Sequence, residues 1–579
     1  MPPRFVAYLL VGALLSLAPR AVRLSAETPD APLLAAAERF EPFFFSPATS
    51  VAALSPDGTK AAFDLRREDK LSILTLDLSR PSQPLAEVVV GSNQLATSWR
   101  MARLGMDQLP RAEVLRWISP DRLVVGSNII ARTFRGQNVL FAFDADGNHA
   151  VALRSGLDED RNLRFRAMSL EPKPLLISSY MVPPMQGMRP YEVWDETDLL
   201  TGKIRKLRKE DQVAFVRSLA DQRKAGEKGS EAYFTFLEVL FPDARIELQR
   251  TTSPLPRRIA RIQTLNHPGS FYVCDPTNRQ IWDLARVAPD NSLRRPVDLE
   301  TFTVPDPVAP ITGWISTPRY SLSERAPVVL FMERANGTVD AAHTYSPIVA
   351  ALTEMGFAVV GIHDPKIKPQ PGRQFLREFD SYLGESERWV IGSNQLRPVE
   401  PPTAYNTRHE ETDANQTFAE RAARALDHAA EHHQLSRRAV AVFGTAFASV
   451  ASLDLAARLP GRFRGIIAYN VPPQSRKRDP AWYASLKASP DGFAGAALVI
   501  YNNGIGSREG ASPQKETAVN TRYQLQRRQV QCELQPAEFL ALQPDRPVET
   551  ALLFAHIERF LNEHLYRYAT EIGELEVRN

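Results

Sequence analysis

The sequence predicts a β-propeller followed by a second unit built on a doubly wound, mostly parallel sheet. From Val51 onward, short strands and tight turns recur at intervals of roughly 40–50 residues, a period typical of propeller blades. Near residue 300 the pattern changes to buried strands that alternate with helix-length segments, which is typical of a parallel sheet with helices on both faces. The expected organisation is a signal peptide, a lead-in segment, the propeller and the sheet domain, at residues 1–26, 27–50, 51–299 and 300–579.

Length and composition limit the classes of function. A chain of 579 residues exceeds what one hydrophobic core usually supports, so more than one domain is expected. The 70 basic and 67 acidic residues nearly balance, and the charge therefore implies no polyanionic partner. The two cysteines, Cys274 and Cys532, fall in different predicted domains. They exclude a disulfide scaffold and a cysteine metal site, and buried free thiols are expected.

The amino-terminal segment resembles a secretory signal. Arg4 supplies a thin basic region, Phe5–Ala18 an apolar core, and Leu24-Ser25-Ala26 an exit of small residues. Arg20 and Arg23 are atypical between core and exit, which leaves an uncleaved anchor open. The apolar core is shorter than a spanning helix needs, and no later stretch qualifies. The sequence therefore predicts export to the periplasm or outside the cell.

The first unit is predicted from its turns. Ser55-Pro-Asp-Gly58 stands between two short strands, and Ser119-Pro-Asp121 and Asp144-Ala-Asp-Gly147 repeat the arrangement. The segment Val213–Arg250 shows few clear strands, so we expect between five and seven blades. An array of plain β-sandwiches is the alternative. Phe43-Phe44-Phe45, in the lead-in, is expected to dock onto this first domain.

The second unit is predicted from apolar runs and their spacing. The expected strands are Pro327–Phe331, Phe357–Ile362, Ala439–Phe443, Phe463–Tyr469, Gly495–Tyr501 and Gln529–Leu534. The expected helices are Tyr345–Met355, Thr417–Glu431, Val450–Leu459 and Ala551–Leu565. A long proline-rich insertion, Gly372–Asn415, lies between strand and helix and is expected to be a lid or disordered.

The central motif of this unit lacks its nucleophile. Gly444-Thr-Ala446-Phe-Ala448 follows a buried strand and precedes a helix of small residues, which is the frame of the G-x-S-x-G nucleophile elbow of α/β-hydrolases. The serine position is Ala446, and the closing glycine is replaced by Ala448. A methyl group cannot attack a carbonyl. The pattern therefore predicts an α/β-hydrolase domain with an inactive centre.

The order of these segments resembles the prolyl oligopeptidase (S9) family of serine peptidases, over about Val51 to Leu565. The resemblance is carried by the elbow and by a set of short motifs: Ser55-Pro-Asp-Gly58, Phe271-Tyr272 with Asp275, Thr312-Gly313-Trp314 with Pro318, Pro327-Val-Val-Leu330 and Met355-Gly-Phe-Ala-Val-Val360. A narrower similarity is to the bacterial lasso-peptide isopeptidases of that family. It rests on Leu542-Gln543-Pro544-Asp-Arg546, which resembles their segment just after the catalytic histidine.

The resemblance implies a serine, an acid and a histidine in that chain order. Ala446 stands for the serine, Asn502–Gly506 offers no carboxylate where the acid is expected, and Glu538–Ala541 offers no histidine. Thr445 and Ser449 are the nearest hydroxyl groups to the serine position. The three missing members predict loss of hydrolysis.

Other clusters carry weaker signals. His428, His432 and His433 on one helix lack a companion carboxylate or cysteine, so a solvated helix face is expected rather than a metal site. His556 and His564 belong to the terminal helix and are expected to be surface or capping residues. Short basic clusters without interleaved aromatics predict no nucleic-acid binding. The sequence predicts no metal and no cofactor.

The preferred hypothesis is an exported pseudopeptidase that binds a peptide or peptide-like ligand in a cavity between the two domains. The residues expected to line that cavity are Ala446, Phe447, Met332, Glu333, His363 and Asp364. One alternative is an active hydrolase of the same type with a displaced catalytic set. The other is a propeller scaffold for protein interaction, since one fold hosts many functions. No membrane partner is expected beyond the possible amino-terminal anchor.

Overall fold

The structure is a computed structural model of the whole chain. It describes residues 31–44, 48–67, 70–80, 83–92, 111–130, 136–155, 164–169, 173–182, 191–208, 211, 224–242, 244–251, 256–264, 267–288, 298–306, 310–318, 325–332, 345–363, 373–375, 389–392, 395–398, 410–445, 447–471, 495–503, 513–538 and 547–568. The predicted signal peptide at residues 1–26 lies outside these ranges.

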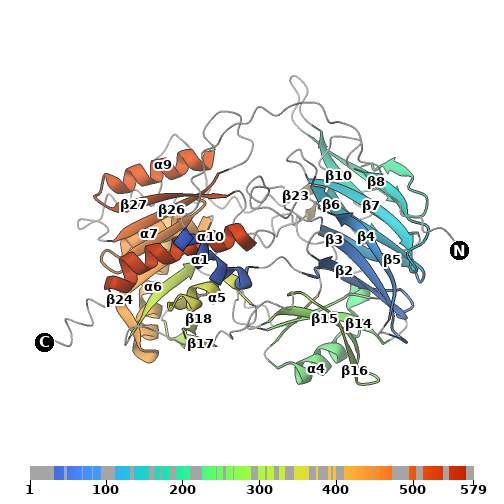
Figure 1. The fold of residues 1–579 in the computed structure, drawn as a ribbon, viewed down its shortest axis with the longest axis horizontal. Coiled ribbons are helices and arrows are strands. Elements are labelled where there is room, and N and C mark those ends of the chain that lie inside the picture. Colours follow the sequence, from blue (N-terminus) through green and yellow to red (C-terminus); the bar gives the residue numbers. More distant parts are fainter. Residues whose placement is uncertain are drawn as a thin grey trace.

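The first half of the chain forms four antiparallel sheets of four consecutive strands each, drawn on the right of Figure 1. The first sheet holds β1 (Ala52–Leu54), β2 (Lys60–Arg67), β3 (Lys70–Asp77) and β4 (Pro84–Ser92). The second holds β5 (Arg111–Ser119), β6 (Arg122–Ile130), β7 (Gly136–Asp144) and β8 (Val151–Ser155). The third holds β9 (Arg164–Ser169), β10 (Leu175–Val182), β11 (Tyr191–Asp198) and β12 (Ile204–Lys206). The fourth holds β13 (Arg245–Leu248), β14 (Arg258–Thr264), β15 (His267–Asp275) and β16 (Gln280–Arg286).

The predicted turn at Ser55-Pro-Asp-Gly58 shows how the sequence fixes these sheets. The Gly58 N–H donates to the Ser55 carbonyl at 2.8 Å, and Gly58 has φ 71°, a conformation that favours glycine. The Ser55 hydroxyl donates to the Asp57 carboxylate at 2.6 Å, and the Thr59 N–H and hydroxyl donate to the same carboxylate. The local sequence thus specifies the hairpin between β1 and β2.

Neighbouring sheets pack through separate apolar clusters. One cluster joins the first sheet to the second and includes Trp117, which is 1% exposed. Another joins the second sheet to the third. A third joins the first sheet to the fourth, and includes Phe271. Ala48 links the same two sheets through the backbone, because its N–H donates to the Val287 carbonyl and its carbonyl accepts from the Arg66 N–H, both at 2.7 Å. The described residues hold four such sheets, and the predicted number of five to seven stays a prediction.

The second half of the chain forms one sheet of eight strands, in the order β17-β18-β20-β19-β24-β25-β26-β27. The two pairings at the β17 side are antiparallel and the other five are parallel. The strands are β17 (Asp298–Val304), β18 (Ile311–Thr317), β19 (Ala326–Met332), β20 (Ala358–Ile362), β24 (Leu435–Thr445), β25 (Gly465–Tyr469), β26 (Ala496–Asn503) and β27 (Gln531–Glu538). The predicted mostly parallel sheet is confirmed by these pairings.

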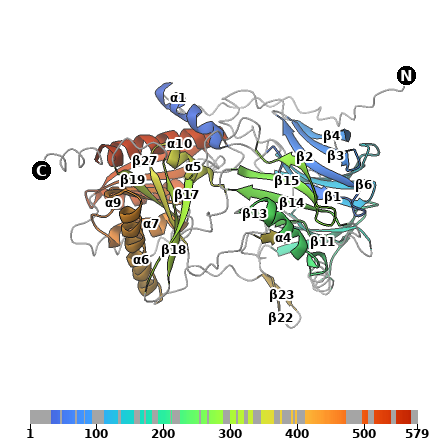
Figure 2. The same cartoon turned by 90° about the horizontal axis from the view of Figure 1, so that it is seen from below.

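Helices cover both faces of this sheet (Figures 1 and 2). One face packs against α1 (Ala31–Phe40), α5 (Pro347–Glu354) and α10 (Pro547–Leu561). The other packs against α6 (Glu410–His432), α7 (Phe447–Arg458) and α9 (Pro513–Gln526). A π-helical turn, η3 (Asn562–Tyr566), extends α10. Helix α5 begins after Ser346, whose hydroxyl accepts from the Val349 N–H, and it ends before Gly356 with φ 93°.

The lead-in segment does not pack where the sequence suggested. Phe43 closes the turn η1 (Glu41–Phe43), and Phe43 and Phe44 are buried in the cluster that holds α10, on the second half of the chain. The expectation that the phenylalanines dock onto the first domain is therefore wrong for these two residues, and Phe45 lies outside the described residues. The physical reason is the complementary apolar surface of α10, where the Phe44 and Phe554 ring centroids lie 4.6 Å apart.

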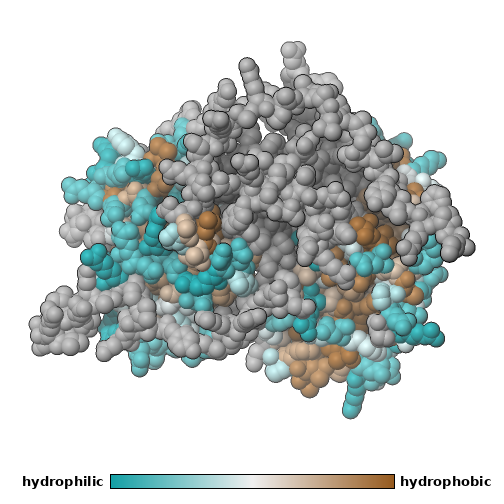
Figure 3. Space-filling model, viewed as in Figure 1, coloured by the Kyte–Doolittle hydropathy of each residue, from teal (hydrophilic) through white to brown (hydrophobic). Residues whose placement is uncertain are grey.

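The structure contains four elements that the sequence did not predict: the strands β21, β22 and β23 and the helix α4. The insertion at 372–415 contributes the strand β21 (Arg373–Phe375) to the fourth sheet, the hairpin β22 (Trp389–Gly392) and β23 (Gln395–Pro398), and the start of α6. The strand-poor segment 213–250 contains the helix α4 (Glu231–Leu240). Hydrophobic surface gathers over the α4 region (Figure 3), where Val239 and Leu240 are 78% and 45% exposed.

Both cysteines are free and buried, as the sequence predicted. The Cys274 thiol donates to the Arg258 carbonyl at 3.2 Å. Burial raises the pKa of each thiol to about 12, so neither is a reactive thiolate near neutral pH. Within the described residues, none of the helices has the length and apolar character needed to cross a membrane.

Candidate functional site

The predicted frame of the elbow is present as a strand before Ala446 and a helix after it. β24 ends at Thr445 and α7 begins at Phe447, which leaves one residue, Ala446, between them. A Cβ at Gly444 would lie 2.2 Å from Ser452 Oγ and 2.4 Å from the Ala448 carbonyl oxygen. Only glycine therefore lets the first turn of α7 approach the strand so closely. Ala446 and the Phe447 side chain lie outside the described residues.

The hydroxyl groups near the turn are engaged in the core. Ser449 and Ser452 are both fully buried. The Ser452 hydroxyl donates to the Ala448 carbonyl at 2.9 Å and contacts Met332 Sδ at 3.5 Å. Ser449 is thus an unsuitable replacement nucleophile, because a substrate carbonyl would have to enter the packed interior. Thr445 is half-buried at the end of β24.

Met332 and His363 end two neighbouring strands at the same edge of the sheet as Thr445. Met332 is fully buried, so its side chain packs in the core. The His363 N–H donates to the Thr312 carbonyl at 2.9 Å, and His363 Nδ1 lies 3.3 Å from the Thr312 hydroxyl. Ligands bind outside the carboxyl ends of strands in open α/β sheets. The structure therefore brings Thr445 and His363 to the expected edge, while Glu333 and Asp364 lie outside the described residues.

Asn470 is a candidate that the sequence analysis missed. It follows β25 directly, and its strand neighbour Tyr469 pairs with Thr445 in register. Asn470 has φ 55°, a left-handed conformation, and its N–H donates to the Ile500 carbonyl at 2.7 Å. Among the described residues its buried Oδ1 atom lacks a hydrogen-bond partner. A strained polar residue at such an edge often serves a function. A polar residue directly after a buried strand was the available signal.

The histidines of the terminal helix serve the packing of β27. The Gln535 side-chain N–H donates to His556 Nε2 at 3.3 Å, which requires a neutral ring. His564 Nε2 lies 3.6 Å from Glu533 Oε1, and His556 and His564 are both only partly exposed. The expectation of a surface or capping role is therefore wrong for His556, because α10 turns this face onto the sheet.

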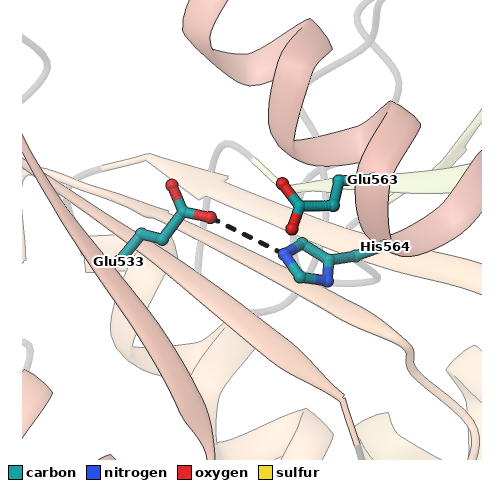
Figure 4. Close-up of side chains that lie close together, drawn as sticks. All are labelled: Glu533, Glu563 and His564. Carbon is teal, nitrogen blue, oxygen red and sulfur yellow. Dashed lines mark ion pairs between the residues drawn. The ribbon is translucent and has the colours of Figure 1, made fainter.

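Glu533, Glu563 and His564 form a small cluster between β27 and η3 (Figure 4). Their potential ligand atoms all lie within 4.8 Å of one another. Glu533 faces His564, and the Arg559 guanidinium approaches the other oxygen of Glu533 at 3.8 Å, so the carboxylate already has a cationic neighbour in Arg559. Glu533 lies on the edge strand β27, three strands away from Thr445 on β24, and the register places it level with Phe443. The cluster is therefore separate from the candidate site.

The histidines of α6 contact one another as a helix face does. The rings of His428 and His432 lie 4.1 Å apart between centroids, and His432 Nδ1 donates to the His428 carbonyl at 2.9 Å. His433 lies 3.7 Å from Glu300. His432 is exposed and the other two are partly exposed.

We expect His556 to make stability depend on acid pH. Burial, and then the charge of Arg559, lowers the pKa of His556 from 6.5 to about 4. Between these two values the unfolded chain binds a proton that the folded chain does not, so the free energy of unfolding falls as pH drops through this window. His556→Gln should make the free energy of unfolding less dependent on pH within this window. Urea titrations at pH 7, 6 and 5 measure the free energy of unfolding at each pH, and His432→Gln, at an exposed position, is the control. If the free energy of unfolding of His556→Gln falls with pH as steeply as that of the unmodified protein, His556 is not the source of the pH dependence.

The chain resembles solved structures only, and at low sequence identity. No family model and no curated protein matches the chain. An acylaminoacyl peptidase from Pyrococcus horikoshii has 12% identity and a TM-score of 0.48, over 90% of this chain and 89% of that one. A structure from a study of two prolyl endopeptidases has 11% identity and a TM-score of 0.38, over 90% and 67%. The AtxE2 isopeptidase has 12% identity and a TM-score of 0.42, over 89% and 82%.

These three structures are S9 family peptidases, which is the family that the sequence resembles. At such identity and TM-scores the likeness assigns no catalytic residue, substrate or activity to this chain. The narrower similarity to lasso-peptide isopeptidases stays a prediction.

Proposed function

We propose that this chain is an exported pseudopeptidase, which binds a peptide or peptide-like ligand between a β-propeller and an α/β-hydrolase domain and does not hydrolyse it. The observation that carries the proposal is the contrast at the elbow. The frame is built as tightly as a working nucleophile elbow requires, since Gly444 admits no side chain. The single residue between β24 and α7 is nevertheless alanine.

The propeller part of the proposal rests on how the four sheets pack. Each sheet contains a meander of four antiparallel strands, which is the form of a propeller blade, and β21 adds a parallel strand to the fourth sheet. The first sheet packs against both the second and the fourth. Ala48 bridges the first and fourth sheets through its backbone, which supports a circular arrangement.

The loss of hydrolysis is argued from the chemistry that the elbow needs. A nucleophile must be paired with a base and an orienting acid. Alanine at 446 removes the first, and the segments expected to supply the acid and the histidine hold neither. Ser449 and Ser452 are buried, which leaves Thr445 as the described hydroxyl with partial exposure nearest the turn.

Peptide binding is supported by the polar groups at the carboxyl edge of the large sheet. Asn470 offers an amide oxygen without a partner among the described residues, and Thr445 offers a hydroxyl group in the neighbouring strand. A peptide backbone carries both donors and acceptors, so these groups can bind it in a fixed orientation. Export is supported by the signal-like segment 1–26, and the ligand that we propose is therefore one of the envelope or of the outside of the cell.

Labelling with a fluorophosphonate tests the proposal. We expect no labelling of the purified protein and no turnover of peptide or ester substrates. Ala446→Ser alone should not restore either, because general-base assistance typically contributes about 10²–10⁴-fold to such reactions. The positive control combines Ala446→Ser with a histidine within 539–541 and an aspartate within 502–506, and we expect labelling of that variant.

Labelling of the unmodified protein that disappears in Thr445→Ala would overturn the proposal in favour of a displaced nucleophile. Turnover that persists in both the unmodified protein and Thr445→Ala would point to another catalytic set and overturn it equally.

A further inference from the structure

The strand β21 crosses from one half of the molecule to the other. In sequence it follows β20 of the large sheet, but it pairs with β13 of the fourth sheet, with Ile246 opposite Arg373 and Leu248 opposite Phe375. This pairing is parallel, whereas β13–β14, β14–β15 and β15–β16 are antiparallel. A meander cannot supply a parallel neighbour to its own edge without a long crossover. The strand is therefore contributed from outside the sheet.

Arg373 fixes this strand to α4. Its guanidinium donates to both oxygens of Glu238 and, at 2.6 Å, to Glu231. It also lies 5.6 Å from the centroid of the Phe234 ring. The two carboxylates raise the pKa of Arg373 above its ordinary value, which agrees with a strong charge-assisted contact. A two-pronged pairing of this kind has the geometry in which a surface ion pair contributes most.

The contacts that β21 makes with β13 and α4 are few, so the strand can detach. β21 has only three residues, and the Glu231 side chain is 76% exposed. Without β21, the edge of β13 would present unpaired backbone groups to solvent. In sequence, nine residues (364–372) separate β21 from His363, which stands at the carboxyl edge of the large sheet. A change at that edge and a change at β21 are therefore linked through a short length of chain.

We propose that β21 is a strap that holds the two halves of the molecule together on this side. Arg373 is its fastening residue, and release of the strap allows the halves to separate. The inference does not depend on the ligand or on the absence of hydrolysis, because it concerns the spacing of the two halves in the free protein.

Spin-label distances across the molecule test the strap. Leu200→Cys and Val519→Cys place labels on the two halves, at positions that are 58% and 44% exposed, while the native cysteines are buried. In this background Arg373→Ala should broaden the distance distribution toward longer values. Amide exchange at the β13 groups that face β21 should rise about tenfold, the effect of losing roughly one charge-assisted contact. Arg205→Ala is the matched control, because it removes an exposed pair with Glu196 inside the third sheet.

Two further variants separate the strap from a general loss of structure. Arg373→Lys keeps the positive charge but loses the bidentate contact of the guanidinium with Glu238. Amide exchange at β13 in this variant should therefore lie between the rates of the parent and of Arg373→Ala. Reversing the pair, Arg373→Glu with Glu238→Arg, should bring the distances back toward the parent. Unchanged exchange at β13 in Arg373→Ala overturns the proposal. Faster exchange with unchanged distances also overturns it, because β21 would then cover an edge without holding the halves.

Discussion

Gly444→Ala should lower the free energy of unfolding of the second half of the chain by about 3 kcal/mol, the upper end of typical overpacking costs. The added Cβ would lie 2.2 Å from Ser452 Oγ and 2.4 Å from the Ala448 carbonyl oxygen. A hydroxyl group can rotate away, but the carbonyl belongs to the backbone of α7. The helix must therefore move off β24, and the contacts of its buried face weaken together.

The matched control is Gly465→Ala in the neighbouring strand β25. There the nearest atom to an added Cβ is the Ala441 Cβ at 3.3 Å, so small adjustments suffice. Urea unfolding followed by circular dichroism compares the two variants. Equal stabilities would contradict the close approach at the elbow, and with it the geometry on which the proposed function depends.

Phe554→Ala should cost about 3–5 kcal/mol, the usual range for removal of a buried phenylalanine ring. Phe554 is fully buried in α10, and its ring centroid lies 4.6 Å from that of Phe44 and 6.4 Å from that of Phe40. The loss has two parts, because the ring packs against the large sheet cluster and also against the lead-in segment.

A truncation that removes residues 1–44 separates these parts. If the lead-in docks on α10 as described, Phe554→Ala and the truncation remove some of the same contacts. The two changes made together should then lower the free energy of unfolding by less than the sum of their separate effects. Tyr523→Ala, at an exposed position on α9, is the control and should combine additively with the truncation. Additive effects of Phe554→Ala and the truncation would show that the lead-in packs elsewhere.

The second half of the fold was predictable because its signals are local. Buried apolar runs predicted the central strands, and Pro327–Phe331 and Ala439–Phe443 lie within β19 and β24. The Ser55–Gly58 turn was predictable for the same reason, since its hydrogen bonds join residues within a few positions. Boundaries shifted where helix-forming residues extended a predicted element, as at the start of α6.

The remaining features depend on contacts between distant segments. Phe44 is an apolar residue that could bury against either half, and only the shape of α10 decides which. β21 is three residues long and pairs across more than a hundred positions of sequence, for which no periodicity exists. Helix α4 was missed because the charged residues around it obscured the apolar spacing of Tyr233, Phe234 and Leu237.

The sequence predicted the strand and the helix that flank Ala446, but it did not predict which side chains surround the candidate site. The spacing around Ala446 predicted the turn between β24 and α7, because glycine and small residues are required where a helix meets a strand so closely. Asn470 could be recognised only once the register placed Tyr469 beside Thr445. The burial of Ser449 and Met332 likewise follows from the packing of α7 on the sheet, which a one-dimensional pattern does not reveal.

The contact between α1 and α10 has a consequence for the order of events during synthesis. Residues 31–40 are synthesised long before residues 547–561, which complete the surface that buries Phe40. At translation rates of about 5–20 residues per second, α1 waits roughly half a minute to two minutes for its partner. An isolated ten-residue helix is too short to be stable in water, so the segment stays unfolded throughout that interval and its apolar side chains stay exposed. Helix α10 therefore completes the burial of α1 only after nearly all of the described residues have been made.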